Sequence, residues 1–386
     1  MRSSRSCPGS SGCFPRLRYV TEISFARGVP APECLPVEEI RACTEAALTD
    51  RTVLQYGPPG GFPALRVWLA ERHGVRPENV VVSNGSLQGL VFLATHLLRG
   101  RRRVLVEKPT YDRPLKILAG LGAEVTGIPM DDEGLDPDAL ERELRAGPPP
   151  AFLYTIPTFQ NPSGRTLSLE RRTRLLELAE SHDLLVVEDD PYGLVRFEGD
   201  PLPTLYELGP RGRVVYSSSF SKTIAPGLRV GYLVLDDELA AAVEAVAVST
   251  YVSPAIFTQA VVFEFLRRGL LETNVERVSA LLRARRDAML EALQSHSPSE
   301  TRWSRPEGGY FLWLDLPPEI DAGELLARAE PTGVTFVEGR DFYASSGGEH
   351  SARLAYSYAS HAEIADGIGR LASVLARVTP APSAAV

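Results

Sequence analysis

The 386-residue chain contains no apolar run long enough to cross a bilayer or to form the core of a signal peptide. It also lacks the composition of a disordered chain, because 44% of its residues are hydrophobic and 23% are charged. An excess of positive charge is absent as well. The formal net charge of -8 gives no electrostatic reason to expect nucleic acid or an anionic membrane as a partner. We therefore expect a folded, cytoplasmic protein that acts on small molecules.

Cysteine and lysine are both scarce. The four cysteines, Cys7, Cys13, Cys34 and Cys43, lie near the N-terminus without a C-x-x-C pair or nearby histidines, so we expect no disulfide scaffold and no metal site. Among the 41 basic residues only three are lysines: Lys108, Lys116 and Lys222. Arginine cannot replace lysine where chemistry needs a primary amine. Each lysine is therefore a candidate for such a role.

Short β-branched runs alternate with helical patterns from residue 80 onward, which is typical of βαβ units around a largely parallel sheet. A mainly helical stretch at 238–295 is followed by three further candidate strands and a closing helix. The predicted fold class is α/β, with a large domain and a smaller α+β domain. The predicted strands of the large sheet are 80–83, 103–107, 124–129, 151–156, 184–188, 213–217 and 229–235, and those of the small domain are 310–316, 335–337 and 353–358.

These patterns divide the chain into five predicted segments. Residues 1–20 are expected to form a flexible arm, and residues 21–50 an N-terminal part of the small domain. The large domain is expected at 51–285 and the rest of the small domain at 286–378. The Ala- and Pro-rich end, 379–386, is expected to be disordered.

Ligands of doubly wound sheets bind beyond the carboxyl ends of the strands, and two polar segments follow predicted strands there. Gly85 and Ser86 stand before a helical pattern, where backbone N–H groups favour an anion such as phosphate; an ordinary helix cap is the alternative. Asp189 lies in an acidic turn that ends in Pro191 and Tyr192. The turn lacks histidine partners, which favours an acid that pairs with a cationic ring nitrogen over a metal ligand.

The third segment surrounds Lys222. Ser217, Ser218, Ser219 and Ser221 precede it, and the run 226–229, Pro-Gly-Leu-Arg, follows it. Hydroxyls and an arginine beside one lysine describe a phosphate cradle next to a nucleophilic amine.

The segments 219–222 and 226–232 resemble the cofactor-lysine signature of the class I/II aminotransferases of fold type I, whose cofactor is pyridoxal 5'-phosphate. The order of motifs matches this family over roughly residues 22–375. The similarity is greatest to the branch that contains aminoadipate and kynurenine aminotransferases and the aminotransferase-like domain of MocR-type regulators. The resemblance implies a seven-stranded, mainly parallel sheet in the large domain.

The resemblance also implies a role for individual residues. Lys222 would bind the cofactor covalently and act as the base, Asp189 would pair with the ring nitrogen, and Tyr111 would stack on the ring. Asn161 and Tyr192 would bond the phenolic oxygen of the ring. Gly28, Asn161 and Arg353 would bind the substrate, with Arg353 gripping its α-carboxylate. The phosphate would be held by Gly85, Ser86, Leu87, Ser219, Ser221, Arg229 and, from a neighbouring subunit, Tyr56.

The implied activity is the ping-pong transfer of an amino group from an L-amino acid to a 2-oxo acid, in a homodimer with shared active sites. Two positions depart from the family pattern: Leu87 stands where relatives usually carry Gln, and Arg27 where they commonly carry Gly. As a hypothesis, Arg27 contacts an acidic group of the substrate.

Three other functions compete with transamination, and the sequence disfavours the second and the third. A cyclising synthase, lyase or decarboxylase would use the same cofactor, because the lysine motif identifies the cofactor better than the reaction. A cofactor-binding sensor is disfavoured, since barely twenty residues precede the first match and a DNA-binding domain needs more. A nicotinamide dehydrogenase needs G-x-G-x-x-G after a strand, and the segment 120–122 lacks the third glycine.

Overall fold

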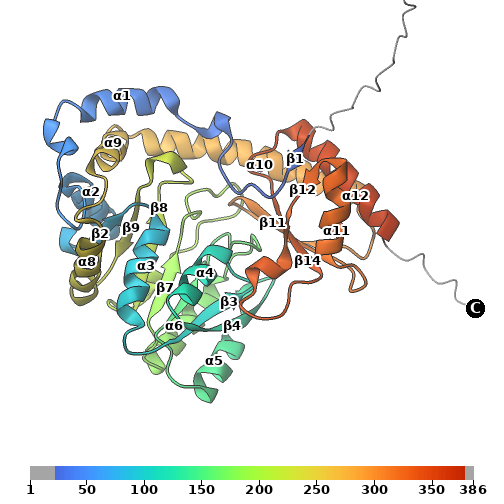
Figure 1. Ribbon diagram of the computed structural model, residues 1–386, viewed down its shortest axis with the longest axis horizontal. Coiled ribbons are helices and arrows are strands. Elements are labelled where there is room, and N and C mark those ends of the chain that lie inside the picture. The colour runs from blue at the N-terminus through green and yellow to red at the C-terminus, as the bar shows by residue number, and fades with distance from the viewer. Residues whose placement is uncertain (1–21, 379–386) are drawn as a thin grey trace, which may run out of the picture.

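The structure, a computed structural model, describes residues 22–378. The predicted arm at 1–20 and the predicted tail at 379–386 lie outside the described residues, as do Cys7 and Cys13. Figure 1 shows a large sheet domain joined to a smaller domain by one long helix, α10 (Leu270–His296). This helix packs against the C-terminal helix α12 (His361–Val378).

The large domain is built on one eight-stranded sheet. All strands are parallel except β9, which is antiparallel to both of its neighbours, and the edge strand β5. In spatial order the strands are β2 (Val80–Ser83), β9 (Gly231–Val234), β8 (Val214–Ser219), β7 (Val186–Asp189), β6 (Phe152–Thr155), β3 (Arg103–Lys108), β4 (Glu124–Asp131) and β5 (Gly134–Leu135).

Alternate residues of these strands enter different apolar cores, as the two-residue period of a strand requires. On β3, Val104 and Val106 pack with one group of helices and Leu105 packs with the other. The first group is α3 (Ser86–Leu97), α4 (Asp112–Gly120) and α8 (Asp237–Tyr251), and the second is α5 (Pro137–Ala146) and α6 (Leu169–Ser181). A further core holds α1 (Val37–Ala47), α2 (Pro63–His73) and α9 (Ile256–Arg267). The short helix α7 (Leu205–Leu208) packs with α5 and α6.

The small domain has a four-stranded antiparallel sheet and a separate pair of strands. The sheet order is β10 (Arg302–Trp303), β11 (Phe311–Asp315), β14 (Ser351–Ala355) and β13 (Val337–Glu338), and β1 (Ile23–Ser24) pairs with β12 (Val334–Thr335). The helices α11 (Ala322–Ala329), α12 and the C-terminal half of α10 cover this domain. Its core includes Ile23 and Phe25, so the N-terminal segment packs with the C-terminal part of the chain.

All seven strands predicted for the large sheet are present, which confirms the fold class. The expectation of seven strands omitted β5, a two-residue strand that returns from β4 through a tight hairpin. The predicted strand 335–337 is wrong, because its two ends belong to β12 and β13 in different sheets. The helical stretch at 238–295 is three helices, α8, α9 and α10. The predicted domain boundary at residue 285 falls inside α10 and stays a prediction.

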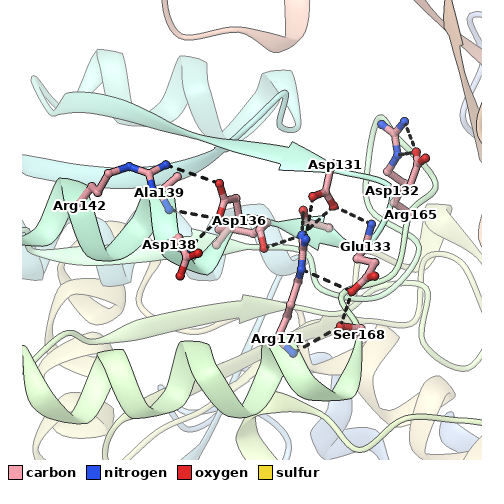
Figure 2. Close-up of polar contacts among 12 residues, drawn as sticks. Asp131, Asp132, Glu133, Asp136, Asp138, Ala139, Arg142, Arg165, Ser168 and Arg171 are labelled. Carbon is pink, nitrogen blue, oxygen red and sulfur yellow. Dashed lines mark hydrogen bonds and ion pairs between the residues drawn. The ribbon is translucent and has the colours of Figure 1, made fainter.

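The β4–β5 hairpin is held by arginines from the chain that follows β6, and Figure 2 shows these contacts. The guanidinium of Arg171 on α6 donates to both carboxylate oxygens of Asp131 at 2.7 Å. It also donates to the Gly134 carbonyl at 3.0 Å. Arg165 binds Asp132 beside it. A bidentate pair with backbone contacts fixes the edge of the sheet.

Candidate active site

A cavity of about 340 Å³ lies beyond the carboxyl ends of β6, β7 and β8, where β11 and β14 of the small domain close it. Of the residues predicted to form the site, every one except Tyr56 lines this cavity. They are Gly28, Gly85, Ser86, Leu87, Tyr111, Asn161, Asp189, Tyr192, Ser219, Ser221, Lys222, Arg229 and Arg353. Fold topology thus brings together residues that span more than three hundred positions of the chain.

The amine of Lys222 follows the end of β8 and points into this cavity. Its Nζ donates to the carbonyl oxygen of Gly28 at 2.7 Å and lies 4.9 Å from the ring centroid of Tyr310. The Tyr310 hydroxyl in turn donates to the Lys222 carbonyl at 3.0 Å. Burial, with smaller contributions from Arg353 and Arg229, lowers the pKa of Lys222 to about 8. About a tenth of this amine is therefore neutral and nucleophilic at pH 7, far more than for an ordinary lysine.

Asp189 ends β7 beneath the same cavity and is 5% exposed. Its Oδ2 accepts a hydrogen bond from the Tyr154 hydroxyl at 2.7 Å, and its Oδ1 accepts one from Ser217 Oγ at 3.3 Å. Burial raises the pKa of Asp189 to about 6, against the lowering effect of these hydrogen bonds. A buried carboxylate that still ionises at neutral pH fits a cationic ring nitrogen as its partner.

One end of the cavity is shaped for a phosphate. Gly85 precedes the first turn of the twelve-residue helix α3 with a φ of 95°, and Ser86 begins the helix. A Cβ at Gly85 would collide with the guanidinium of Arg229, so only glycine leaves room for this close approach. Ser219 Oγ and Ser221 Oγ, 2.8 Å apart, complete the end. Free helix N–H groups, two hydroxyls and one arginine suit an anion.

The opposite end of the cavity presents a buried guanidinium with spare donors. Arg353 on β14 is 7% exposed, and its Nη1 donates to Asn161 Oδ1 at 3.1 Å while its Nη2 donates to the Ala26 carbonyl at 2.9 Å. Its Nε has no hydrogen-bond partner among the described residues. Phe311 packs against the guanidinium, 4.3 Å from the ring centroid. A carboxylate entering the cavity would satisfy this donor.

Two tyrosines line the wall between these ends. Tyr111 immediately precedes α4, and burial, followed by Asp112 and Asp189, raises its pKa to about 12. Tyr192 is buried, with its ring edge-on to Phe311 at 5.9 Å between centroids. Both rings are therefore neutral and held in place at neutral pH, as stacking and hydrogen bonding to a bound ring would require.

Two residues discussed from sequence lie away from the cavity. Tyr56 is 81% exposed in the loop after the short 3-10 helix Arg51–Leu54, so any contact with a cofactor would have to be made in a neighbouring subunit. The guanidinium of Arg27 lies over the ring of Tyr358 at 4.8 Å and faces a separate depression with Glu22 and Glu363. The hypothesis that Arg27 contacts a substrate acid in this cavity gains no support from that position.

Several residues that line the cavity were not predicted as site residues from the sequence. Asp112, Arg113, Pro191 and Pro226 are adjacent to or near predicted residues, so wider windows around the motifs would have found them. Val29 follows Gly28 in the same way. Phe311 carried no such signal, because the alternation within a strand does not reveal which face meets a ligand.

No cluster of His, Cys, Asp and Glu side chains that could hold a metal ion occurs within residues 22–378. No helix in that range is long and apolar enough to cross a membrane. Cys34 and Cys43 are buried free thiols, and burial raises the pKa of both.

Comparison with known proteins gives a consistent family. Residues 22–371 match the model of the family "Aminotransferase class I and II". Aromatic-amino-acid aminotransferase 1 of Thermococcus litoralis is 36% identical over 92% of this chain and 88% of that protein. Two solved structures superpose closely. The α-aminoadipate aminotransferase of Thermus thermophilus, bound to N-(5'-phosphopyridoxyl)-L-leucine, has a TM-score of 0.88 and 38% identity over 92% of both chains. The kynurenine aminotransferase of Pyrococcus horikoshii has a TM-score of 0.89 and 37% identity, over 93% of this chain and 92% of that chain.

The chain belongs to the class I and II aminotransferases. It is a pyridoxal-phosphate-dependent enzyme of fold type I that moves an amino group between an L-amino acid and a 2-oxo acid.

Proposed function

We propose that Lys222, Asp189 and Arg353 carry this transamination from the cavity described above. The observation that supports the proposal most strongly is their common placement: a partly neutral amine, a buried carboxylate and a buried, under-bonded guanidinium line one cavity of about 340 Å³. Arg353 would bind the substrate α-carboxylate with its fork of donors. Lys222 would take the proton from the substrate Cα at Nζ and return one from the same atom.

Pyridoxal phosphate, when bound, supplies an electron sink for the negative charge that develops at the substrate Cα. Asp189 would hold a proton on the ring nitrogen of the cofactor, since its carboxylate is ionised above a pKa of about 6. Gly85, Ser86, Ser219, Ser221 and Arg229 would bind the phosphate. Leu87 would contribute through its backbone, because its side chain carries no polar atom.

Asn161 would donate to the phenolic oxygen of the ring. Its Oδ1 is already bonded to Arg353 Nη1, which leaves the Nδ2 end to donate. Tyr192 would bond the same oxygen, and Tyr111 would cover the ring face. Because Asn161 would link the ring to Arg353, binding of a carboxylate at Arg353 would change the hydrogen bond between Asn161 and the phenolic oxygen.

We further propose amino donors with a long or aromatic side chain. Val29, Leu87 and Phe311 give the cavity an apolar wall, and Arg113 stands at its edge with an exposed side chain. The related proteins are named for aromatic amino acids, α-aminoadipate and kynurenine. Apolar lining residues suit a large aromatic side chain, and one cation near the edge suits a long acidic side chain.

The working unit would be a homodimer with two shared sites. Leu54, Tyr56 and Val252 are 66%, 81% and 57% exposed, which is unusual for apolar and aromatic side chains on two linked loops. The Tyr56 loop is anchored to the Val252 loop, because the Gly57 N–H donates to Ser253 Oγ at 3.2 Å. A second copy would cover these side chains and receive Tyr56 at its phosphate end. We also propose that the protein is located in the cytoplasm, which cell fractionation would test.

The test is the visible absorption spectrum of the purified protein and of Lys222→Ala, before and after adding single L-amino acids. We expect a visible band in the wild type that large or aromatic donors abolish, and no such band in the variant. A band that persists with every donor would contradict transamination. The matched control is Lys116→Arg, which removes an exposed primary amine, keeps the positive charge beside the lining residue Asp112 and should leave the spectrum unchanged.

A further inference from the structure

The buried carboxylate of Glu107 lies outside the cavity but is linked by hydrogen bonds to two loops that carry cavity residues. Glu107 on β3 is 2% exposed. Its Oε1 accepts hydrogen bonds from Thr155 Oγ1 at 2.6 Å and from the Ile156 N–H at 3.2 Å. Its Oε2 accepts one from Gln160 Nε2 at 2.9 Å. All three donors are neutral, so the charge is stabilised by hydrogen bonds alone.

The side-chain amide of Gln160 uses both of its ends. Nε2 donates to Glu107 and also to the Pro109 carbonyl at 2.9 Å, and Oε1 accepts from the Ser163 N–H at 2.8 Å. Pro109 lies two residues before Tyr111, and Asn161 lies between Gln160 and Ser163. The amide therefore ties the loop after β3 to the loop after β6.

A carboxylate is suited to setting the orientation of this amide. An ionised carboxylate only accepts hydrogen bonds, so it requires the NH₂ end of Gln160 to face it. The carbonyl end must then face the Ser163 N–H, and the second amide hydrogen must face Pro109. A neutral amide at position 107 would not favour this orientation, because its own NH₂ group would face Gln160.

We propose that Glu107 is a positioning residue for transamination, which through Gln160 fixes the loops that carry Tyr111 and Asn161 against the bound cofactor. The proposal rests on the roles proposed above for Tyr111 and Asn161. Burial raises the pKa of Glu107 to about 7, so the carboxyl is ionised above that pH, and its buried charged form costs free energy that a neutral side chain would avoid. Such a cost is understandable where the direction of a hydrogen-bond network matters for the site.

The decisive variant is Glu107→Gln, which preserves shape and removes the charge. In this variant, the side-chain oxygen at position 107 must still accept hydrogen bonds from Thr155 and Ile156. The NH₂ group at position 107 then faces the NH₂ group of Gln160. Two donors then face each other, the link breaks and the Asn161 loop loosens. Since a hydrogen bond to the charged form favours that form, weaker contact from Asn161 should raise the pH midpoint at which the visible band of the bound cofactor titrates. We expect a rise of about one pH unit, with kcat/KM reduced on the order of tenfold.

Glu188→Gln is the matched control. Glu188 is also buried, and it accepts hydrogen bonds from the backbone N–H groups of Leu205 and Tyr206, which belong to neither loop. Its ion pair with Arg172, which bonds the start of the loop after β6, is 4.0 Å long. Burial, with Asp190 as a smaller cause, raises the pKa of Glu188 to about 8. Replacing this carboxyl should leave the band midpoint unchanged. An equal shift in Glu188→Gln would overturn the proposal, as it would show a general effect of replacing a buried carboxyl group.

A second variant, Gln160→Met, breaks the same link from the other end and carries the test if Glu107→Gln does not fold. We expect the same upward shift of the midpoint, and a double variant that shifts it no further than either single one. Independent, additive shifts or an unshifted midpoint would overturn the proposal. The band titration needs no substrate. A wild-type band that no amino acid removes would therefore contradict the proposed transamination while leaving this test intact.

Discussion

The hydroxyl of Tyr154 donates a hydrogen bond to Oδ2 of Asp189 at 2.7 Å, across the neighbouring strands β6 and β7. Both side chains are buried. Burial, followed by Asp189, raises the pKa of Tyr154 well above its ordinary value, so the phenol stays a donor at every working pH. Asp189 is thereby stabilised as a carboxylate and oriented toward the cavity.

Removing this donor should shift the acid limb of the pH–rate profile. In Tyr154→Phe, Asp189 loses a hydrogen bond to its charged form, which raises its pKa. Because the ionised carboxylate is the active form, activity is lost as the pH falls through that pKa, and a higher pKa moves the loss to higher pH. We expect the acid limb of kcat to rise by about one pH unit. The pH dependence of kcat at saturating donor measures this.

The control for that prediction is Tyr216→Phe. Tyr216 makes the equivalent contact to the neighbouring acid, with its hydroxyl donating to Asp190 Oδ2 at 3.0 Å, but Asp190 does not line the cavity. The same loss of a phenol should leave the acid limb in place. If both variants move the limb equally, the effect belongs to packing and Asp189 is not its cause.

Gly85→Ala should weaken cofactor binding. The added Cβ meets the Arg229 guanidinium, and the φ of 95° is strained for any residue with a side chain. Displacing the arginine from the phosphate end should raise the dissociation constant of pyridoxal phosphate on the order of tenfold, measured by equilibrium dialysis. Gly74→Ala is the control, because its φ is also positive, at 63°, but nothing lies within 4 Å of the new Cβ. That variant should lose some stability and bind the cofactor normally.

Sequence patterns predicted the large sheet well because most of its strands are buried on both faces and separated by amphipathic helices. They failed at β12 and β13, where one apolar run supplies two short strands to different sheets. Strand pairs of two residues carry too little periodicity to be recognised, and long-range packing decides where they lie.

The site was predicted where its residues fall in short local motifs, as around Lys222 and Asn161. Glu107, Gln160 and Tyr154 do not line the cavity, and they make hydrogen bonds to Asp189 or within the neighbouring loops. Nothing in their local sequence indicates which neighbour they will bond, because the hydrogen bonds form only when β3, β6 and β7 lie side by side. Tyr56 is the opposite case: its role was inferred from a motif, and a single chain leaves it exposed.

Arg171→Met should lower stability without changing catalysis. The substitution removes the bidentate bond to Asp131 and the bond to the Gly134 carbonyl, which hold the β4–β5 hairpin (Figure 2). None of these three residues lines the cavity. We expect the free energy of unfolding to fall by about 1 kcal/mol, measured by urea unfolding, with kcat unchanged. Arg142→Met is the control, since its contact to Asp136 is 3.7 Å long and its side chain is 72% exposed. A comparable loss in that variant would rule out the bidentate pair as the cause.

The lowered pKa of Lys222 predicts how the cofactor-free enzyme regains its cofactor. Only the neutral amine attacks the cofactor aldehyde, and the neutral fraction grows as the pH rises through the pKa of about 8. The rate of reconstitution should therefore rise up to about pH 8 and then level off, as followed by the growth of the visible band after mixing with pyridoxal phosphate. Arg353→Met tests the cause: it removes one of the two nearby cations that lower this pKa, so the plateau should begin at higher pH. A rate that keeps rising toward pH 10 in the wild type would mean that the lysine is not desolvated as its surroundings require.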